Sequence, residues 1–457
     1  MNDKSEFMGK DPVWPLLLRF CGPSIIAAVV TATYNLVDAI FAGALGLEAL
    51  AALAAAFPLM IIYTSIGFCI GFGSSSLISR SLGARKQEEA NVAAGNAISV
   101  FLIAGAVATL VFYPSLKPLL SLFGASGEVL EQAISYMSIE TGFIALNFLL
   151  LVLAEMVRAG GDPSIASGAA ILSTVINCIM DPVLAFGLGP FPRMGIAGLA
   201  LATTVGRAVS SVILLVYLTS RSVYSIRLRH LLPRPWAMKE ILGVGMSSTV
   251  RMAGGSVAQV LSVKVASSFG VIPLALLAVL FRINSLVFHP SFGLGQGIIP
   301  LVGYNYGAKL NHRVREIVTK ATTVVLAYGV VFWLAVTVFA APILSVFGDG
   351  ADYLGQGIWA LRIFAFDSLT IGAQMVLSCF FQGLGKWAPA LIVSSSRQLI
   401  FLIPCVLILP QLFGLTGLWL AFPVASALAL ALSLAWAIAE FRSWENPSSA
   451  SQTRNKY

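Results

Sequence analysis

The stretch GFGSSSLISRSLGARK, Gly71–Lys86, decides the fold because a similar stretch, GQGIIPLVGYNYGAKL, occurs again at Gly295–Leu310. Three further pairs support the repeat: KPLLSLFGAS (Lys117–Ser126) with APILSVFGDG (Ala341–Gly350), RAGGDPS (Arg158–Ser164) with QGLGKWA (Gln382–Ala388), and GIAGLALA (Gly195–Ala202) with GLTGLWLA (Gly414–Ala421). The first three pairs are 224 positions apart (71 to 295, 117 to 341, 158 to 382), and the last is 219 apart (195 to 414). Internal repetition reveals architecture, so the chain consists of two similar halves.

The composition is that of an integral membrane protein. Of its 457 residues, 58% are hydrophobic and only 11% are charged, far from the roughly one-quarter charged usage of soluble domains. The apolar runs have about 20 residues, the length that a helix needs to cross a bilayer. Short alternating strands, the mark of an outer-membrane barrel, are not seen.

Polar, Gly and Pro punctuation divides the chain into twelve predicted spans. They cover residues 14–41, 50–79, 91–113, 131–156, 166–188, 196–219, 240–268, 273–302, 315–338, 355–380, 388–410 and 416–440. We therefore predict an all-α protein with a six-helix bundle at 1–218, a basic cytoplasmic linker at 219–239, a second bundle at 240–441 and a disordered cytoplasmic tail at 442–457.

An even number of helices in each repeat gives the two copies the same orientation in the membrane. The bundles are then related by an axis along the membrane normal, and a central cavity is expected between them near the midplane.

Basic residues predict the orientation of the chain. Loops after even-numbered spans carry Arg80, Arg85, Lys86, Arg158, Arg221, Arg227, Arg229, Arg234, Lys239, Lys309, Arg313, Arg315, Lys320 and Lys386, whereas those after odd-numbered spans carry only Lys117 and Arg193. The positive-inside rule then puts both termini in the cytoplasm of a cell whose plasma (inner) membrane holds the protein.

Several other functions find no support in the sequence. The five cysteines form no CxxC and the three histidines form no spaced cluster, so neither a metal enzyme nor a disulfide framework is indicated. The chain has no P-loop for ATP. Its net charge of +8 is explained by basic span ends rather than by nucleic-acid binding. We expect a protein that is not an enzyme and has no cofactor.

The repeated stretches, together with RAGGDPSIA, INCIMDP (Ile176–Pro182) and GIAGLALAT, resemble the multidrug and toxic compound extrusion (MATE) transporters, most of all their DinF-like and MepA-like branches. The similarity runs from about Leu17 to Phe441. It implies a monomeric antiporter that exports cationic or amphipathic organic compounds in exchange for H⁺ or Na⁺. A lipid-linked oligosaccharide flippase of the same superfamily is the alternative.

Asp38 is the first puzzle, because a carboxylate at the centre of a span costs about 2.5–3.5 kcal/mol and normally faces protein or water. Residues three and four apart share a helix face, so Asn35 and Tyr34 lie beside Asp38. In the fifth span, Asn177 precedes Asp181 by one turn. If the two acids face each other, burial and like charge favour uptake of a proton.

The same oxygens also suit Na⁺, since hard cations prefer carboxylate, amide and hydroxyl ligands. The resemblance implies that Asp38, Asn177, Asp181 and Thr203 line a cavity in the N-terminal bundle, where they could bind the coupling cation, and that Pro23 is a bending point of the first helix. Plainer interpretations remain open: Asp38 as an interfacial residue, Asp181 with Pro182 as a helix end, Thr203 bonded to its own helix, and Pro23 as a fixed kink.

Other charged residues lie within the predicted spans. Glu140 and Asp367 are secondary candidates for the cation site. A third set, which we expect to pair between helices or to reach the membrane surface, comprises Arg207, Arg251, Lys264, Arg282, Arg362 and Arg397. Lys264 and Arg282 would oppose a cationic drug unless an acid such as Asp367 neutralises them.

Overall fold

The structure is a computed structural model that describes residues 5–348 and 350–445, apart from the side chain of Asn35. Its elements in the first half are α1 (Phe7–Lys10), α2 (Val13–Leu45), α3 (Leu47–Gly83), α4 (Gln87–Leu122), α5 (Gly127–Gly142), α6 (Ile144–Ala159), α7 (Pro163–Phe186), α8 (Ile196–Arg221) and the short η1 (Leu228–His230). Those in the second are α9 (Pro235–Ser268), α10 (Val271–Gly307), α11 (Asn311–Val338), α12 (Ala340–Ser345), α13 (Ala351–Ala365), α14 (Ser368–Leu384), α15 (Trp387–Ser395), the π-helical η2 (Ser396–Leu402) and α16 (Ile403–Glu445).

The described helices account for twelve membrane passes in a multi-pass protein. Nine helical segments are long and apolar enough to span a bilayer, and the pair α5–α6, bent by 51°, adds a tenth. The last segment, from Trp387 onward, supplies two passes because the chain turns at Gly414 (φ 56°) and Gly417 packs on the Leu409 backbone. The less apolar α9 is the twelfth. The predicted all-α class and twelve-span layout are confirmed.

The predicted linker and tail can be compared with the helices. The α8 helix ends at Arg221 and α9 begins at Pro235, so both helices reach into the predicted linker at 219–239. The α16 helix continues to Glu445, four residues into the predicted tail, and the remaining tail residues, 446–457, lie outside the described residues.

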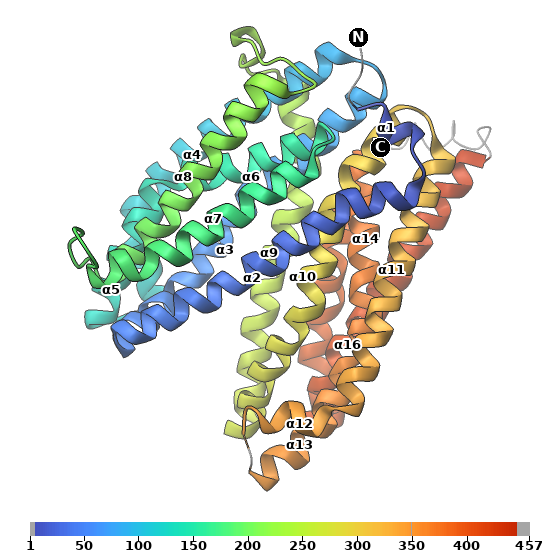
Figure 1. Cartoon of the computed structure of the whole chain (residues 1–457). Coiled ribbons are helices and arrows are strands. Elements are labelled where there is room, and N and C mark those ends of the chain that lie inside the picture. The colour runs from blue at the N-terminus through green and yellow to red at the C-terminus, as the bar shows by residue number, and fades with distance from the viewer. Residues whose placement is uncertain (1–4, 349, 446–457) are drawn as a thin grey trace.

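Two bundles make up the molecule (Figure 1). Helices α2–α8 form one arm and α9–α16 the other. The arms meet at the end that holds α1 and the end of α16, and they diverge toward the end that holds α5 in one arm and α12 and α13 in the other.

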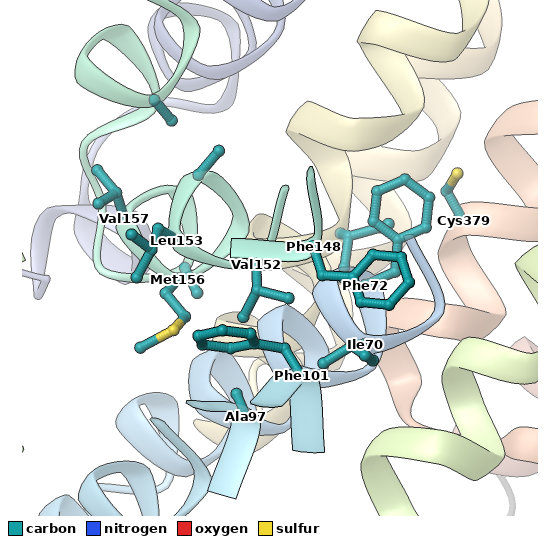
Figure 2. Close-up of a cluster of buried hydrophobic side chains, with 14 of the residues drawn as sticks. Ile70, Phe72, Ala97, Phe101, Phe148, Val152, Leu153, Met156, Val157 and Cys379 are labelled. Carbon is teal, nitrogen blue, oxygen red and sulfur yellow. The ribbon is translucent and has the colours of Figure 1, made fainter. Parts of the chain in front are cut away.

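The buried apolar residues follow the same division. One large core runs through the first bundle, where Phe72, Phe101 and Val152 come from α3, α4 and α6 (Figure 2). This core continues into the second bundle at the end where the arms meet, through residues such as Ile298 and Phe380. A separate core, which includes Leu280 and Phe422, fills the far end of the second bundle alone.

Backbone conformation supports the repeat independently of sequence. Gly195 and Gly414, which are 219 positions apart, have φ values of 58° and 56°. Arg85 and Lys309, 224 positions apart, are the non-glycine residues with positive φ among the described residues, at 59° and 60°. A positive φ is uncommon for such side chains, so its recurrence at matched positions marks two copies of one structure.

Glycines of the repeated stretch let the two bundles touch backbone to backbone. A Cβ on Gly83 would lie 1.9 Å from the carbonyl oxygen of Tyr304, and one on Gly307 would lie 2.1 Å from that of Arg80. These two contacts are related by the 224-residue repeat. Gly245 of α9 meets the carbonyl of Cys69 in α3 in the same way, at 1.8 Å. Backbone contacts therefore hold the two bundles together at the end where the arms meet.

Candidate cation site between α2, α7 and α8

Asn177 organises the polar centre of the first bundle. It lies on α7 one turn before Asp181, and its amide Nδ2 donates to Asp181 Oδ1 at 3.1 Å and to Thr203 Oγ1 of α8 at 3.0 Å. Thr203 also donates to the Leu199 carbonyl of its own helix at 3.1 Å. Both the predicted site contact and the plainer backbone bond of Thr203 are therefore present.

Asp38 of α2 joins this group. Its carboxyl group lies close enough to those of Asp181 and Glu140 to interact with them electrostatically. Asp38 is 3% exposed, Asn177 is 2% exposed and Asp181 is fully buried. The structure brings together the four residues of the predicted site. Pro182 lies inside α7, which continues to Phe186, so Asp181 does not end its helix.

Three oxygens of this group have no hydrogen-bond partner among the described residues: Asp38 Oδ1, Asn177 Oδ1 and Asp181 Oδ2. Buried polar atoms are nearly always paired, and each exception calls for an explanation. These are acceptor atoms on three neighbouring side chains, so a proton or a small hard cation would satisfy them.

A buried ion pair lies beside the four residues. Glu140 of α5 accepts from Arg207 Nη1 of α8 at 2.6 Å, and Tyr34 interacts with the same guanidinium. Glu140 is thus neutralised, in keeping with the interhelical pairing expected of Arg207. The carboxyl groups of Asp38, Asp181 and Glu140 thus share this region with a single guanidinium, that of Arg207. The excess of acidic groups favours uptake of positive charge.

The remaining first-helix predictions stay untested. The side chain of Asn35 lies outside the described residues. Pro23 lies within α2, which continues on both sides of it from Val13 to Leu45. Its role as a bending point stays a prediction.

Asp367 lies at the break between α13 and α14 in the second bundle and is fully buried. Arg397 of η2 donates to both of its oxygens, at 3.0 and 3.3 Å, and Asn284 Nδ2 donates at 2.8 Å. Ser426 also donates to this carboxylate. Asp367 is therefore paired with Arg397 and does not neutralise Lys264 or Arg282.

The other intramembrane bases have different surroundings. Arg251 is buried against the Met375 sulfur and 5.7 Å from the Phe292 ring, and its Nε has no partner in the described chain. Arg362 donates to the Thr337 carbonyl at 3.3 Å. Lys264 and Arg282 are exposed, and no ion pair is found for either within residues 5–348 and 350–445.

Glu155 is a buried acid that the sequence analysis missed, although it lies in a predicted span as Asp38 does. It pairs with Arg158 in α6, and both side chains are at least 96% buried. Arg158, like Arg80 and Arg221, lies in the last turn of its helix rather than in a loop. The orientation still rests on the other loop bases. No group of three or more His, Cys, Asp or Glu suited to a metal occurs in the described part of the chain.

Two six-pass bundles of one repeat, with a cluster of buried polar residues inside the first bundle, are the architecture of a class of secondary transporters. The MatE family model matches residues 23–183 and 248–407. The chain therefore belongs to the MatE family, whose members are transporters rather than enzymes.

Individual relatives span nearly the whole chain. The multidrug export protein MepA of Staphylococcus aureus (strain MSSA476) is 25% identical over 95% of both chains. The outward-facing conformation of a multidrug resistance MATE family transporter of the MOP superfamily matches 97% of this chain and 99% of its own, with 26% identity and a TM-score of 0.90. A MATE crystal structure in a bent conformation matches 98% and 99%, with 25% identity and a TM-score of 0.91.

Proposed function

We propose that the protein exports amphipathic organic compounds in exchange for H⁺ or Na⁺, which binds at Asp38, Asn177, Asp181 and Thr203. The three unpaired, buried oxygens of this group carry the proposal, because they offer acceptors for a cation where neither solvent nor a protein donor reaches them. Multidrug export by the MepA relatives supports the substrate class.

Alternating access explains how exchange could occur. The end where the arms meet carries Arg85, Lys86 and Lys309 and is therefore proposed to be cytoplasmic. It is closed by the glycine contacts of Gly83, Gly245 and Gly307. The described state is then outward-open in the plasma membrane. One chain supplies both bundles, so we propose a monomer.

Coupling of cation entry to substrate export would follow from competition between the cation and the substrate within the first bundle. A cation at Asp38 changes the charge next to α2, and we propose that α2 then bends about Pro23 and narrows the path for the substrate. A solved MATE structure in a bent conformation supports the idea that such bending is available to this fold.

The test is efflux of a cationic dye from vesicles under separately imposed pH and sodium gradients. Asp38→Asn and Asp181→Asn should each abolish gradient-driven efflux, whereas Asp352→Asn, an exposed acid of α13, should leave it unchanged. Dependence on one gradient would identify the ion. Undiminished efflux in both site variants would reject the site, and transport of lipid-linked oligosaccharide without dye transport would favour the flippase.

A further inference from the structure

One face of α10 contacts the first bundle near the closed end. A Cβ on Gly297 would lie 2.8 Å from the Phe20 carbonyl oxygen of α2, and one on Gly293 would lie 2.5 Å from that of Ser24. Residues separated by 4, 7 or 11 positions share a helix face at about 100° per residue. His289, Leu286 and Arg282 therefore continue the face of Gly293 toward the outer end.

This face loses its cover along the helix. Gly293 and Gly297 are buried, whereas Leu286 is 59% exposed and Arg282 is also exposed. The helix α2 that covers the two glycines no longer covers the residues beyond them. These residues belong to the outer half of α10, in the part of the molecule where the two arms diverge (Figure 1).

Arg282 must meet water or an anion. It lies 11 residues inside α10, counted from Val271, about 16 Å along the axis. Asp38 lies seven residues from the outer end of α2 at Leu45. An arginine within a membrane-spanning helix is costly in hydrocarbon and normally faces an aqueous path or a partner. Within the described residues it forms no ion pair, and Asp367, the buried acid of the same bundle, is bound by Arg397.

Aromatic rings lie between the bundles just inside this face. Phe292 of α10 is 5.3 Å from Phe68 of α3 and 6.0 Å from Phe288, and Phe72 of α3 is 6.1 Å from Phe292 (centroid distances). An aromatic or apolar group can stack on such rings. Positive charge, at Arg282, and aromatic rings, at Phe288 and Phe292, therefore occur along the same helix, α10.

We propose that Arg282 determines substrate specificity by binding the carboxylate of an aromatic amphiphile, so that the protein prefers zwitterionic compounds to purely cationic ones. The cationic group of such a substrate would be drawn to the acidic first bundle while its carboxylate pairs with the guanidinium. This proposal rests on the proposed function, since it specifies the substrate class of the same transport path.

Rhodamine B and its ethyl ester test the proposal, because they share one cationic ring system and only rhodamine B carries a free carboxylate. Binding to the purified full chain in nanodiscs is measured by fluorescence polarisation, and efflux is measured in vesicles. The wild type should bind rhodamine B more tightly than the ester. Arg282→Gln should reduce that preference by about tenfold, the effect of one charge-assisted hydrogen bond, while Arg282→Lys retains part of it.

Arg362→Gln is the matched control, because Arg362 is an exposed arginine of the same bundle whose guanidinium is bound by the Thr337 carbonyl. It should leave the preference unchanged. Efflux of both dyes with equal preference in wild type and Arg282→Gln would overturn the role of Arg282 and leave antiport intact. If neither dye binds or moves, both proposals are overturned. Loss of rhodamine B binding on adding phosphatidylglycerol, seen only with Arg282 present, would assign the arginine to a lipid and overturn the substrate assignment.

Discussion

Thr203 and Thr204 are adjacent buried threonines that differ in one contact. Each donates to the carbonyl four residues earlier, but only Thr203 also accepts from Asn177. Thr203→Val should leave the Asn177 amide short of an acceptor, at a cost of about 1–3 kcal/mol. We expect the ion concentration for half-maximal efflux to rise about tenfold, with Thr203→Ser restoring it. Equal effects of Thr203→Val and the control Thr204→Val would contradict a role in the cation site.

Arg207 should matter for stability through Glu140. Removing one partner of a buried ion pair leaves an uncompensated charge and costs about 3–5 kcal/mol. Arg207→Met should therefore lower the midpoint of thermal unfolding in detergent by several degrees. Glu140→Gln combined with Arg207→Met should recover part of the loss, because both charges are then gone. A double variant as unstable as Arg207→Met would show that packing, not charge, explains the effect.

At the scale of the helix, Gly245 and Gly243 of α9 make a matched test and control for substitution by alanine. A Cβ on Gly245 would lie 1.8 Å from the Cys69 carbonyl oxygen, whereas one on Gly243 would make an ordinary 3.5 Å contact with Trp387. Gly245→Ala should push α9 away from α3 and expose Cys69, now 5% exposed. Faster labelling of Cys69 by N-ethylmaleimide would report this exposure, and mass spectrometry would identify the labelled cysteine. Labelling as slow as in Gly243→Ala would contradict the closed interface.

Helix number and the repeat could be predicted from the sequence, because span length and apolarity are local properties. The breaks within two spans could not. The bend after Gly142 and the break at Asp367 depend on contacts between helices, such as the pairing of Asp367 with Arg397. Yet Phe143 and Asp367 are 224 positions apart, so a break found in one half predicts one in the other.

The candidate site was predictable in part for the same reason. An acid in a span is visible as an energetic anomaly, and helix periodicity links Asn177 to Asp181. Sequence alone could not tell that Arg207 neutralises Glu140, because those residues come from different helices. A search for acidic residues in every predicted span would also have found Glu155.

At the scale of the whole molecule, both backbone contacts and a charge pair join the two bundles at one end, and the charge pair can be tested alone. Arg80 of α3 and Glu240 of α9 pair across the two bundles at 2.8 Å, with 17% and 32% of their side chains exposed. A pair this accessible is worth no more than about 1 kcal/mol. Arg80→Glu should remove it and add repulsion, which raises the open population about fivefold.

The exchanged pair Arg80→Glu with Glu240→Arg separates charge from shape. It should return Cys69 labelling toward the wild-type rate, since attraction between the bundles is restored. High salt should speed labelling in the wild type and slow it in Arg80→Glu, because screening weakens attraction and repulsion alike. The double variant could instead label as fast as expected from adding the effects of Arg80→Glu and Glu240→Arg. Arg80 would then act through its other contacts, with the Ser76 carbonyl and with Gly385. The glycine contacts alone would hold the bundles together.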